Sequence, residues 1–406
     1  MNNFTYVEEE NVAKIKVIGV GGGGGNAINN MIESGLCGVK FIVANTDAQD
    51  LDKSKANTKI QLGEQLTGGR GAGMDPEMGR EAALESADLI RENLRDSNMV
   101  FIAAGLGGGT GTGAAPVIAE IAKELDILTV AVVTKPFRFE AQNRARQAEE
   151  GLKILRQKAD AVIVIPNDRL RGLAQKNTRL MDMFKKADEI LHNSVKGITD
   201  LIINPGLVNL DFNDVKKVLS QKGMAIMGIG TASGENRALE AAEKAISHPL
   251  LEDISIAGAN KVLFNITAGP DLTMTETIEA SDWIKQEIGK DEIDVFWGNS
   301  IDESLGDEIR ITVIATGIGE EKEPAIASPT RNIRNVKGVA RGVVRDFTPE
   351  DRKYEQALDL PTYYRLKQKN AREKADQEAG AEKKKTSRFR DIIDLDVPTF
   401  LRRSAD

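Results

Sequence analysis

The stretch Gly107-Gly108-Gly109-Thr110-Gly111-Thr112-Gly113 follows an apolar run at residues 99–104 and leads into a helical pattern at residues 117–125. A strand, a glycine turn and a helix in this order are typical of a phosphate-binding turn. Glycines let backbone N–H groups approach an anion, and the helix N-terminus adds a partial positive charge. Thr110 and Thr112 can add hydroxyl donors. No lysine follows the glycines, so this is not the G-x-x-x-x-G-K-[ST] loop of the common NTPases.

Two more glycine-dense segments lie beside predicted strands and helices. The apolar residues 14–20 run into five glycines at residues 21–25, and then into Asn26 and a helix over residues 27–33. Residues 67–73 form the third segment, followed by a helix that extends to about Asp96. Three loops of this kind can surround one triphosphate, although the third alone is equally compatible with a surface loop.

A dinucleotide-binding site is the alternative for the first glycine segment. That fingerprint has a glycine-rich turn after the first strand and an acidic residue about 20 positions further on, and Asp47 lies at such a distance. Five consecutive glycines fit the G-x-G-x-x-G spacing poorly. A dehydrogenase also needs no second glycine turn like the one at residues 107–113.

Strands and helices alternate through the first half of the chain. The predicted strands are apolar throughout, which indicates a parallel sheet covered on both faces. Ligands of such sheets bind at the carboxyl ends of the strands, where the glycine segments fall. The predicted strands cover residues 14–20, 41–44, 99–104, 128–134 and 161–165.

The second half has a different pattern. A long helix with one apolar stripe is predicted over residues 179–203, and Asn204-Pro205-Gly206 ends it. Beyond it the sequence predicts a smaller α+β domain, with helices at residues 235–247 and 275–287 and strands at 262–267, 293–297 and 308–315. The predicted fold class is therefore α/β: a parallel-sheet domain, a long central helix and a smaller α+β domain.

Two pairs of residues four positions apart have both a structural and a functional interpretation. Phe184 and Asp188 can present a ring face and a carboxylate to one purine, and a carboxylate suits the N–H donors of guanine. Since Phe184 lies on the apolar stripe, the sequence alone favours a core Phe184 and a solvated Asp188. Glu140 and Arg144 at this spacing are more often a surface ion pair on a helix.

Three polar residues, Asn209, Asp211 and Asp214, crowd one turn before the next predicted helix. Asp211 is a good N-cap, and Asp214 is favourable in the first helical turn. Capping does not explain Asn209, nor two carboxylates and an amide in one turn. The functional interpretation is a catalytic cluster that positions a water for attack on a phosphate.

Composition narrows the function classes. The chain has 406 residues and a net charge of -8, which disfavours sequence-independent nucleic-acid binding. Cys37 is the single cysteine, and His192 and His248 are the two histidines, so we expect neither a disulfide framework nor a metal site. No apolar run approaches the roughly 20 residues of a membrane span, and residues 1–10 do not resemble a signal peptide. We expect a cytoplasmic protein.

The C-terminal part has two segments of distinct composition. Residues 320–390 are rich in Lys, Glu, Gln and Pro, which predicts a disordered spacer. Residues 391–403 are compact and amphipathic, which is typical of a docking motif that orders on binding, with a frayed tail as the alternative.

The residues quoted above resemble the tubulin/FtsZ family of GTPases, whose signature G-G-G-T-G-[ST]-G agrees with residues 107–113 at every position. The match extends to Lys16-Val17-Ile18-Gly19-Val20, Ala44-Asn45-Thr46-Asp47, Thr134-Lys135-Pro136-Phe137 and Asn209-Leu210-Asp211-Phe212-Asn213-Asp214. It includes the tail Asp396-Val397-Pro398-Thr399-Phe400-Leu401-Arg402-Arg403. Only the spacer matches nothing.

The resemblance implies a nucleotide site for GTP or GDP, accompanied by Mg²⁺. Glu140 and Arg144 would contact the ribose side, and Phe184 with Asp188 the guanine. Ala72 and Gly73 would lie near the terminal phosphate. The remaining nucleotide contacts would be Gly22, Gly23, Gly24, Gly25, Asn26, Gly108, Gly109, Thr110, Gly111 and Thr112. No metal ligand is implied.

The resemblance also implies a function. The family's GTPases polymerise head to tail into filaments that form the bacterial division ring, at mid-cell beneath the inner membrane. Asn209, Asp211 and Asp214 would then reach the nucleotide of the next subunit and catalyse its hydrolysis there. The tail, Asp391 to Arg403, would dock on membrane-tethering division proteins similar to FtsA or ZipA, and regulators of division would be further partners.

The expected domains are a GTP-binding domain at residues 1–178, a central helix at 179–206 and a C-terminal domain at 207–319. The spacer at 320–390 and the docking peptide at 391–406 follow. One departure concerns the third loop, where the family commonly has Thr-Arg-Gly-Leu-Gly-Ala-Gly and this chain places Arg70 at the apolar position. A scaffold without turnover, an oxidoreductase and a filament of another cellular role are the competing hypotheses.

Overall fold

The computed structural model of the chain describes residues 13–170, 172, 177–203, 206, 208, 210–220, 224–248, 259–288 and 293–318. Asn209, the predicted spacer at 320–390 and the predicted docking peptide at 391–406 lie outside these residues.

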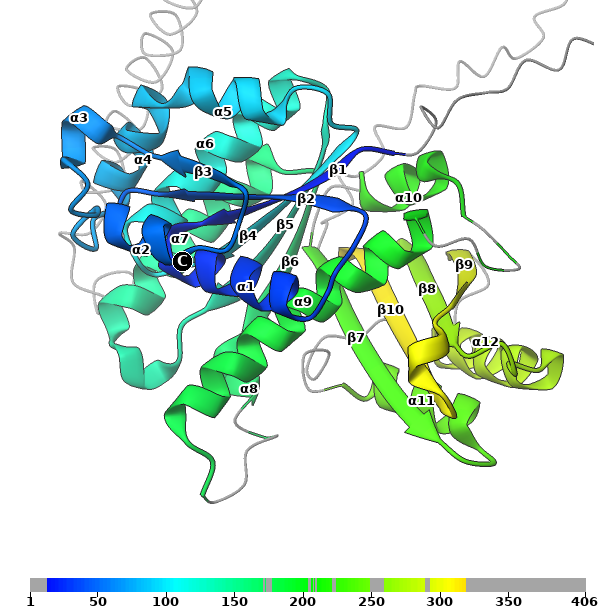
Figure 1. The fold of residues 1–406 in the computed structure, drawn as a ribbon. Helices are drawn as coiled ribbons and strands as arrows, with labels where there is room; N and C mark the ends of the chain where they lie inside the picture. Colours follow the sequence, from blue (N-terminus) through cyan, green and yellow to red (C-terminus); the bar gives the residue numbers. More distant parts are fainter. Residues whose placement is uncertain are drawn as a thin grey trace, which may run out of the picture. The chain divides into compact units, whose positions relative to one another are not determined.

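One ten-stranded sheet runs through the described chain, in the order β3-β2-β1-β4-β5-β6-β7-β10-β8-β9 (Figure 1). The strands β1 to β6 are parallel to their neighbours, which confirms the parallel sheet predicted from their apolar sequences. β10 is antiparallel to both β7 and β8. The strands are β1 (Ile15–Val20), β2 (Val39–Asn45), β3 (Thr58–Gln61), β4 (Met99–Gly105), β5 (Leu128–Lys135), β6 (Ala161–Pro166), β7 (Met224–Ser233), β8 (Lys261–Ala268), β9 (Asp294–Ile301) and β10 (Glu308–Ile318).

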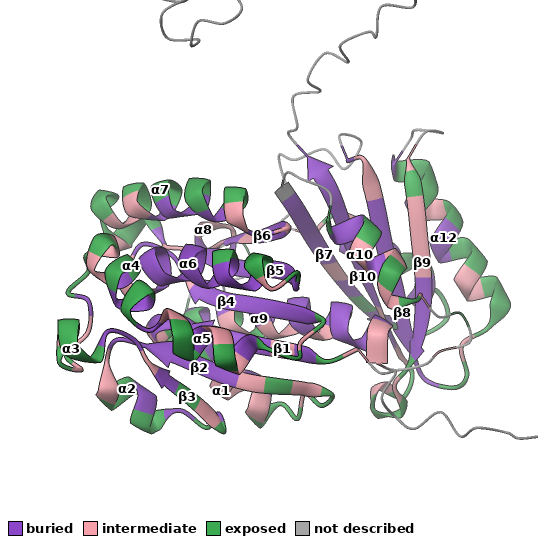
Figure 2. Cartoon of the chain, turned by 90° about the horizontal axis from the view of Figure 1, so that it is seen from above, coloured by how far each residue is buried: buried purple, intermediate pink, exposed green. Residues whose placement is uncertain are grey.

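Helices cover both faces of the parallel part of the sheet (Figure 2). On one face pack α4 (Pro76–Glu85), α5 (Ala87–Leu94), α6 (Thr110–Glu124) and α7 (Gln142–Lys158). On the other face pack α1 (Gly21–Glu33), α2 (Ala48–Lys53), α8 (Asn167–Leu170) and α9 (Leu180–Ile203). The helix α10 (Phe212–Leu219) packs on the antiparallel part, where the Thr316 hydroxyl of β10 donates to the carbonyl oxygen of Val218 at 3.0 Å. The antiparallel part is covered by α11 (Arg237–Ile246) and α12 (Met274–Ile288).

The central helix α9 joins the two parts of the sheet. Its buried residues, among them Leu191, Val195 and Ile198, belong to the same core cluster as Val130 of β5 and Ile314 of β10. The predicted helix over residues 179–203 is therefore confirmed, and its apolar stripe packs against strands from both halves of the chain.

Some elements differ from the prediction. The five glycines form the first turns of α1 rather than a loop before it, because α1 begins at Gly21. The long helix predicted up to Asp96 is broken at Ser86 into α4 and α5. The Ser86 hydroxyl accepts a hydrogen bond from Gly63 N at 3.0 Å. Gly63 lies in the turn between β3 and α3 (Glu64–Thr67), so this bond fixes that turn to the point where α4 ends and α5 begins.

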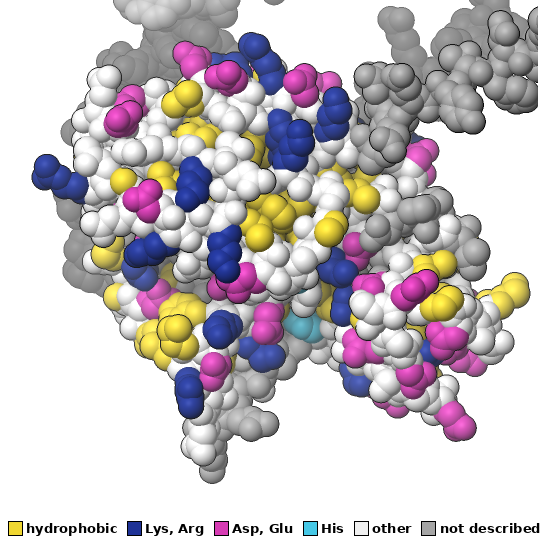
Figure 3. Space-filling model, viewed as in Figure 1, with side chains coloured by type: hydrophobic (Ala, Val, Ile, Leu, Met, Phe, Trp, Pro, Cys, Tyr) yellow, Lys and Arg dark blue, Asp and Glu magenta, His cyan; other side chains and the backbone are white. Residues whose placement is uncertain are grey.

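Charged side chains of both signs are spread over the face shown in Figure 3. Of the helices that the structure describes, none combines the length and the apolar character needed to cross a bilayer.

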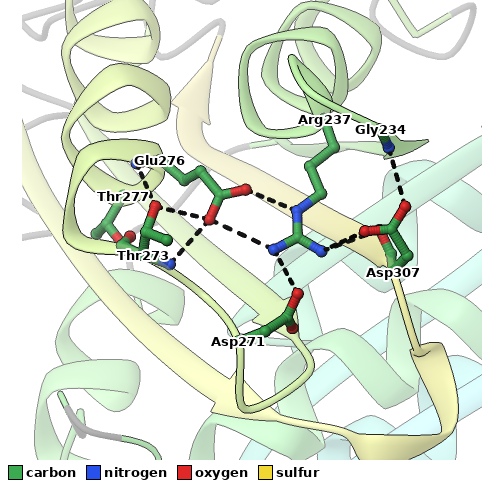
Figure 4. A network of polar contacts seen from close by, with 7 residues as sticks. All are labelled: Gly234, Arg237, Asp271, Thr273, Glu276, Thr277 and Asp307. Carbon is green, nitrogen blue, oxygen red and sulfur yellow. Dashed lines mark hydrogen bonds and ion pairs between the residues drawn. The ribbon is translucent and has the colours of Figure 1, made fainter.

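A buried arginine ties three loops together at one end of the antiparallel part (Figure 4). Arg237 is 5% exposed, and its guanidinium pairs with Glu276 at 2.6 Å, Asp271 at 2.8 Å and Asp307 at 3.1 Å. Thr273 donates to Glu276 from both its backbone N and its hydroxyl, each at 2.8 Å. The hydrogen bonds from Arg237 lower the pKa of Glu276 to about 2, although burial opposes the shift.

We expect Glu276→Gln to lower the free energy of unfolding at pH 7 by about 2 kcal/mol, since the folded state prefers the ionised carboxylate. A carboxyl whose pKa is depressed by folding stabilises the protein above its unfolded pKa, and that contribution is lost as the pH falls from about 4.5 toward 2. Denaturant unfolding at several pH values measures this. Asp307→Asn is the matched control, because Asp307 is 73% exposed. A wild-type-to-variant difference that is the same at pH 7 and pH 3 would contradict the assignment.

Candidate nucleotide-binding site

A cavity of about 540 Å³ lies at the carboxyl ends of the parallel strands. Its walls come from the N-termini of α1 and α6, the segment between β5 and α7, and the N-terminal part of α9. Eleven of the residues predicted to contact nucleotide line it together: Gly22, Gly23, Asn26, Gly108, Gly109, Thr110, Gly111, Glu140, Arg144, Phe184 and Asp188.

Two helix N-termini supply most of the positive potential in the cavity. The helices α1 and α6 begin at Gly21 and Thr110, and both of these residues line it. The first N–H groups of a helix have no partner within the helix and carry a partial positive charge. Arg144 is the one basic side chain among the described lining residues. An anion bound here is therefore held mainly by backbone N–H groups.

Five predicted contacts are not in the lining: Gly24, Gly25, Ala72, Gly73 and Thr112. Gly24 has a packing role, because a Cβ there would lie 2.3 Å from the carbonyl oxygen of Ala103 in β4. The Thr112 hydroxyl is buried and accepts a hydrogen bond from Gly107 N at 2.8 Å, so it shapes the glycine turn. Direct contacts of these five residues with a nucleotide stay a prediction.

The third glycine segment reaches the cavity through Gly71 and Met74. Its backbone is held against the end of β2 by an isolated antiparallel β-bridge between the backbones of Asp47 and Arg70. In addition, Gly71 N donates to the carbonyl oxygen of Thr46 at 3.2 Å. The Arg70 side chain, which departs from the family pattern, is exposed.

One aromatic ring, that of Phe184, lines the cavity among the described residues, and two further rings lie behind it. Phe184 is 38% exposed, so its sequence-based interpretation as a core residue is wrong. Its ring packs edge-on against Phe137, with centroids 5.5 Å apart, and Phe139 stacks on Phe137 with centroids 5.1 Å apart. Phe137 is buried and holds the other two rings in place. The exposed part of Phe184 is a surface on which a planar base can stack.

Asp188 lies one helical turn after Phe184 and lines the same cavity. Burial, with a smaller contribution from Glu189, raises the pKa of its carboxyl to about 7. The structure shows no ion pair or hydrogen bond to this carboxylate within the described residues. A ligand that donates N–H groups to it would therefore meet an unsatisfied acceptor, and binding would favour the ionised form.

Glu140 and Arg144 pair at 2.5 Å, but not as a surface pair on one helix. Glu140 ends the 3₁₀ turn η2 (Arg138–Glu140), whereas Arg144 lies in α7. Glu140 also accepts a hydrogen bond from Phe137 N at 2.9 Å. Ala141 joins the two elements with a φ of +99°, a region that residues with a side chain rarely adopt. The pair is held in the cavity wall by this strained junction.

Polar residues at the ends of other strands also line the cavity, and their sequence context predicted no role for them. Asn45 is the last residue of β2 and Thr46 follows it. Thr134 lies at the carboxyl end of β5, and Asn167 comes directly after β6. Asn167 is 5% exposed, and its amide oxygen has no hydrogen-bond partner among the described residues. The signal that could have found them is a polar residue at the carboxyl end of an apolar strand.

The comparisons with known proteins agree with this geometry. Residues 14–175 match the GTPase domain of the tubulin/FtsZ family, and residues 223–319 match the C-terminal domain of the FtsZ family. The chain belongs to the tubulin/FtsZ family. It is 49% identical to the cell division protein FtsZ of Coxiella burnetii over 96% of each chain, and 47% identical to that of Pseudomonas putida over 97% of each. A solved FtsZ dimer from M. jannaschii is 45% identical, with a TM-score of 0.71 over 76% of this chain and 89% of that one.

The family's GTPase domain makes the chain a GTP hydrolase, yet the predicted catalytic acids are not in the cavity. Asp211 and Asp214 lie at the start of α10, which follows the C-terminal end of α9. Phe184 and Asp188 lie near the N-terminal end of α9. Asp211 is the N-cap of α10, as the sequence predicted, and accepts a hydrogen bond from Asp214 N at 2.8 Å. The Asp214 carboxylate pairs with Lys217 at 3.1 Å. Asn209 lies outside the described residues.

We expect the affinity for GDP to depend on Asp188 and on pH. Because the pKa of this carboxyl is about 7, it is mostly protonated at pH 6 and mostly ionised at pH 8. If guanine donates to the carboxylate, the affinity of the wild type relative to Asp188→Asn rises about tenfold between these pH values. Calorimetric titration of both proteins with GDP measures the two affinities. Their ratio is independent of the protonation of the GDP phosphates, because both proteins bind the same ligand. A ratio independent of pH would show that the base does not contact this carboxylate.

We also expect Ala141→Gly to raise the free energy of unfolding by about 1 kcal/mol, because glycine adopts a positive φ without steric strain. Chemical denaturation measures it. Ala145→Gly, at an exposed position inside α7, is the control and should lower stability by about 1 kcal/mol. Equal destabilisation by both changes would show that the φ of Ala141 is not strained.

Proposed function

We propose that this protein is a GTP hydrolase of bacterial cell division that assembles head to tail into filaments. Each junction between two subunits would bring the Asn209, Asp211 and Asp214 loop of one copy to the nucleotide of the next. Two observations support the assembly: the curated relatives are named cell division proteins, and one solved relative is described as a dimer.

The separation of the two halves of the active site carries this proposal. The helix α9 has 24 residues, which corresponds to about 36 Å at 1.5 Å per residue. Phe184 and Asp188 lie near its first residue, and the α10 N-terminus follows its last. One chain cannot place both ends at one phosphate while this helix is straight. A heterologous contact that repeats completes the site at every junction and builds an open filament.

Mg²⁺ would accompany the nucleotide, to neutralise charge on the transferred phosphoryl group. The described residues contain no cluster of three His, Cys, Asp or Glu that could hold a metal alone. Such a cluster is not required, because Mg²⁺ in phosphate sites uses one or two carboxylates together with phosphate oxygens. Asp47 and Asp50 are carboxylates in the cavity lining, so the donor set fits.

Location and partners follow from the same proposal. The protein would work in the cytoplasm at the division ring, and the peptide from Asp391 to Arg403 would dock on membrane-tethering proteins similar to FtsA or ZipA. That peptide combines apolar residues with both charges, as short docking motifs do.

Mixing two inactive variants tests the shared site directly. Asp214→Ala removes the catalytic carboxylate, and we expect GTP turnover to fall about 100-fold or more. Gly108→Asp places a negative charge in the phosphate end of the cavity, at a position with no atom within 4 Å of an added Cβ. Each variant alone should be inactive, but a mixture should regain phosphate release, because some junctions combine an intact cavity with an intact loop.

Glu243→Ala, an exposed carboxylate on α11, is the matched control and should leave turnover unchanged. No recovery on mixing, together with a specific activity that is constant on dilution, would place the whole active site within one chain. Binding of GTP without phosphate release by the wild type would instead support a scaffold without turnover.

A further inference from the structure

A second concave surface lies at the amino ends of the parallel strands, on the sheet edge opposite the nucleotide cavity. It encloses about 610 Å³, and its basic side chains are Lys14, Lys16, Lys40 and Arg95, which we call the basic concavity. The chain as a whole has a net charge of -8, so this concentration of positive charge is local. In Figure 3, Lys and Arg side chains, in dark blue, stand together near the start of β1.

The sheet geometry holds three of these cations together. Lys16 and Lys40 are direct register partners on the neighbouring parallel strands β1 and β2. Lys16 and Lys40 belong to the face of the sheet on which Ile18 packs, and Lys14 lies just before β1, where its backbone N donates to Asn98 Oδ1 at 2.8 Å. Like charges directly opposite one another on neighbouring strands are destabilising. The fold therefore maintains a repulsive arrangement that packing alone does not require.

The surrounding protein compensates this charge only in part. Lys16 is half-buried and donates to the carbonyl oxygens of Asn93 at 2.7 Å and Arg95 at 2.5 Å, at the end of α5. Burial lowers the pKa of Lys16, the neighbouring Lys40 and Lys14 lower it further, and Asp96 opposes them. Within the described part of the chain, Lys14, Lys40 and Arg95 form no side-chain ion pair. These three are exposed, and so are available to a partner.

We propose that the basic concavity is a docking surface for an acidic segment of a partner protein, with carboxylates bound between Lys14, Lys40 and Arg95. Its shape favours a peptide over a membrane, because Lys16 is recessed where a flat bilayer cannot follow. Glu92 and Asp96 line the same concavity and repel any anion close to them, so a segment with a few spaced carboxylates suits it better than a dense array of phosphates. Carboxylates on flexible side chains can reach the cations while avoiding these two residues.

Fluorescence anisotropy with labelled hexaglutamate tests the proposal on the full chain at low and physiological ionic strength. The double variant Lys14→Gln/Lys40→Gln should bind the peptide more weakly, by up to about thirtyfold, which is the product of the losses expected for two exposed charge pairs. Its GTP turnover should be unchanged and its Tm should rise, because a like-charge repulsion has been removed.

The matched control is Lys123→Gln/Lys153→Gln, which removes the same charge from exposed positions on α6 and α7. It should bind the peptide within about twofold of wild type. Equal losses in both double variants would overturn the proposal in favour of non-specific attraction, and so would an absence of binding by the wild type. Binding to phosphatidylserine vesicles but not to hexaglutamate would overturn it in favour of a membrane surface.

Discussion

Anion binding by backbone groups is the constraint on which the nucleotide site depends. With Arg144 as the one basic side chain among the described lining residues, the N-termini of α1 and α6 must both point into the cavity. This requires the first turns of α1 to lie against the sheet without side chains between them. Gly19 and Gly24 meet this requirement, because a Cβ on Gly19 would lie 2.4 Å from the oxygen of Gly24. Glycine normally destabilises a helix by about 1 kcal/mol, and here the close approach offsets that loss.

Much of the fold was predictable because its signals are local. Apolar strands and the stripe of α9 each follow from a short window of sequence and were confirmed, whereas the glycines at residues 21–25 form the start of α1 and not a turn before it. The short strand β3 was not predicted, since only Ile60 of its four residues is buried. Nor was β7, whose glycines and alanines weaken a strand pattern. Both strands form because they pair with neighbouring strands, and a short window of sequence contains no information about that pairing.

In the candidate site, too, features with a local sequence signal were predictable and features that depend on long-range contacts were not. The glycine turns were evident from their residues, whereas Phe184 and Asp188 looked like a core residue and a surface residue. Their place in the cavity wall depends on α9 beginning beside the carboxyl ends of β5 and β6, a long-range relation that periodicity does not encode. Asn167 was overlooked because a single asparagine after a strand is common. Only its burial, with an amide oxygen that has no partner among the described residues, distinguishes it.

The junction between β6 and β7 has a mechanical consequence. Two register pairs, Val162 with Met224 and Ile163 with Ala225, join the parallel and antiparallel parts of the sheet, fewer than at any other strand pair described. Twisting one half against the other therefore breaks few hydrogen bonds at this seam, while α9, packed on both halves, resists their separation. Rotation of the two halves about this seam would therefore be resisted mainly by the packing of α9 on both of them, and only weakly by backbone hydrogen bonds.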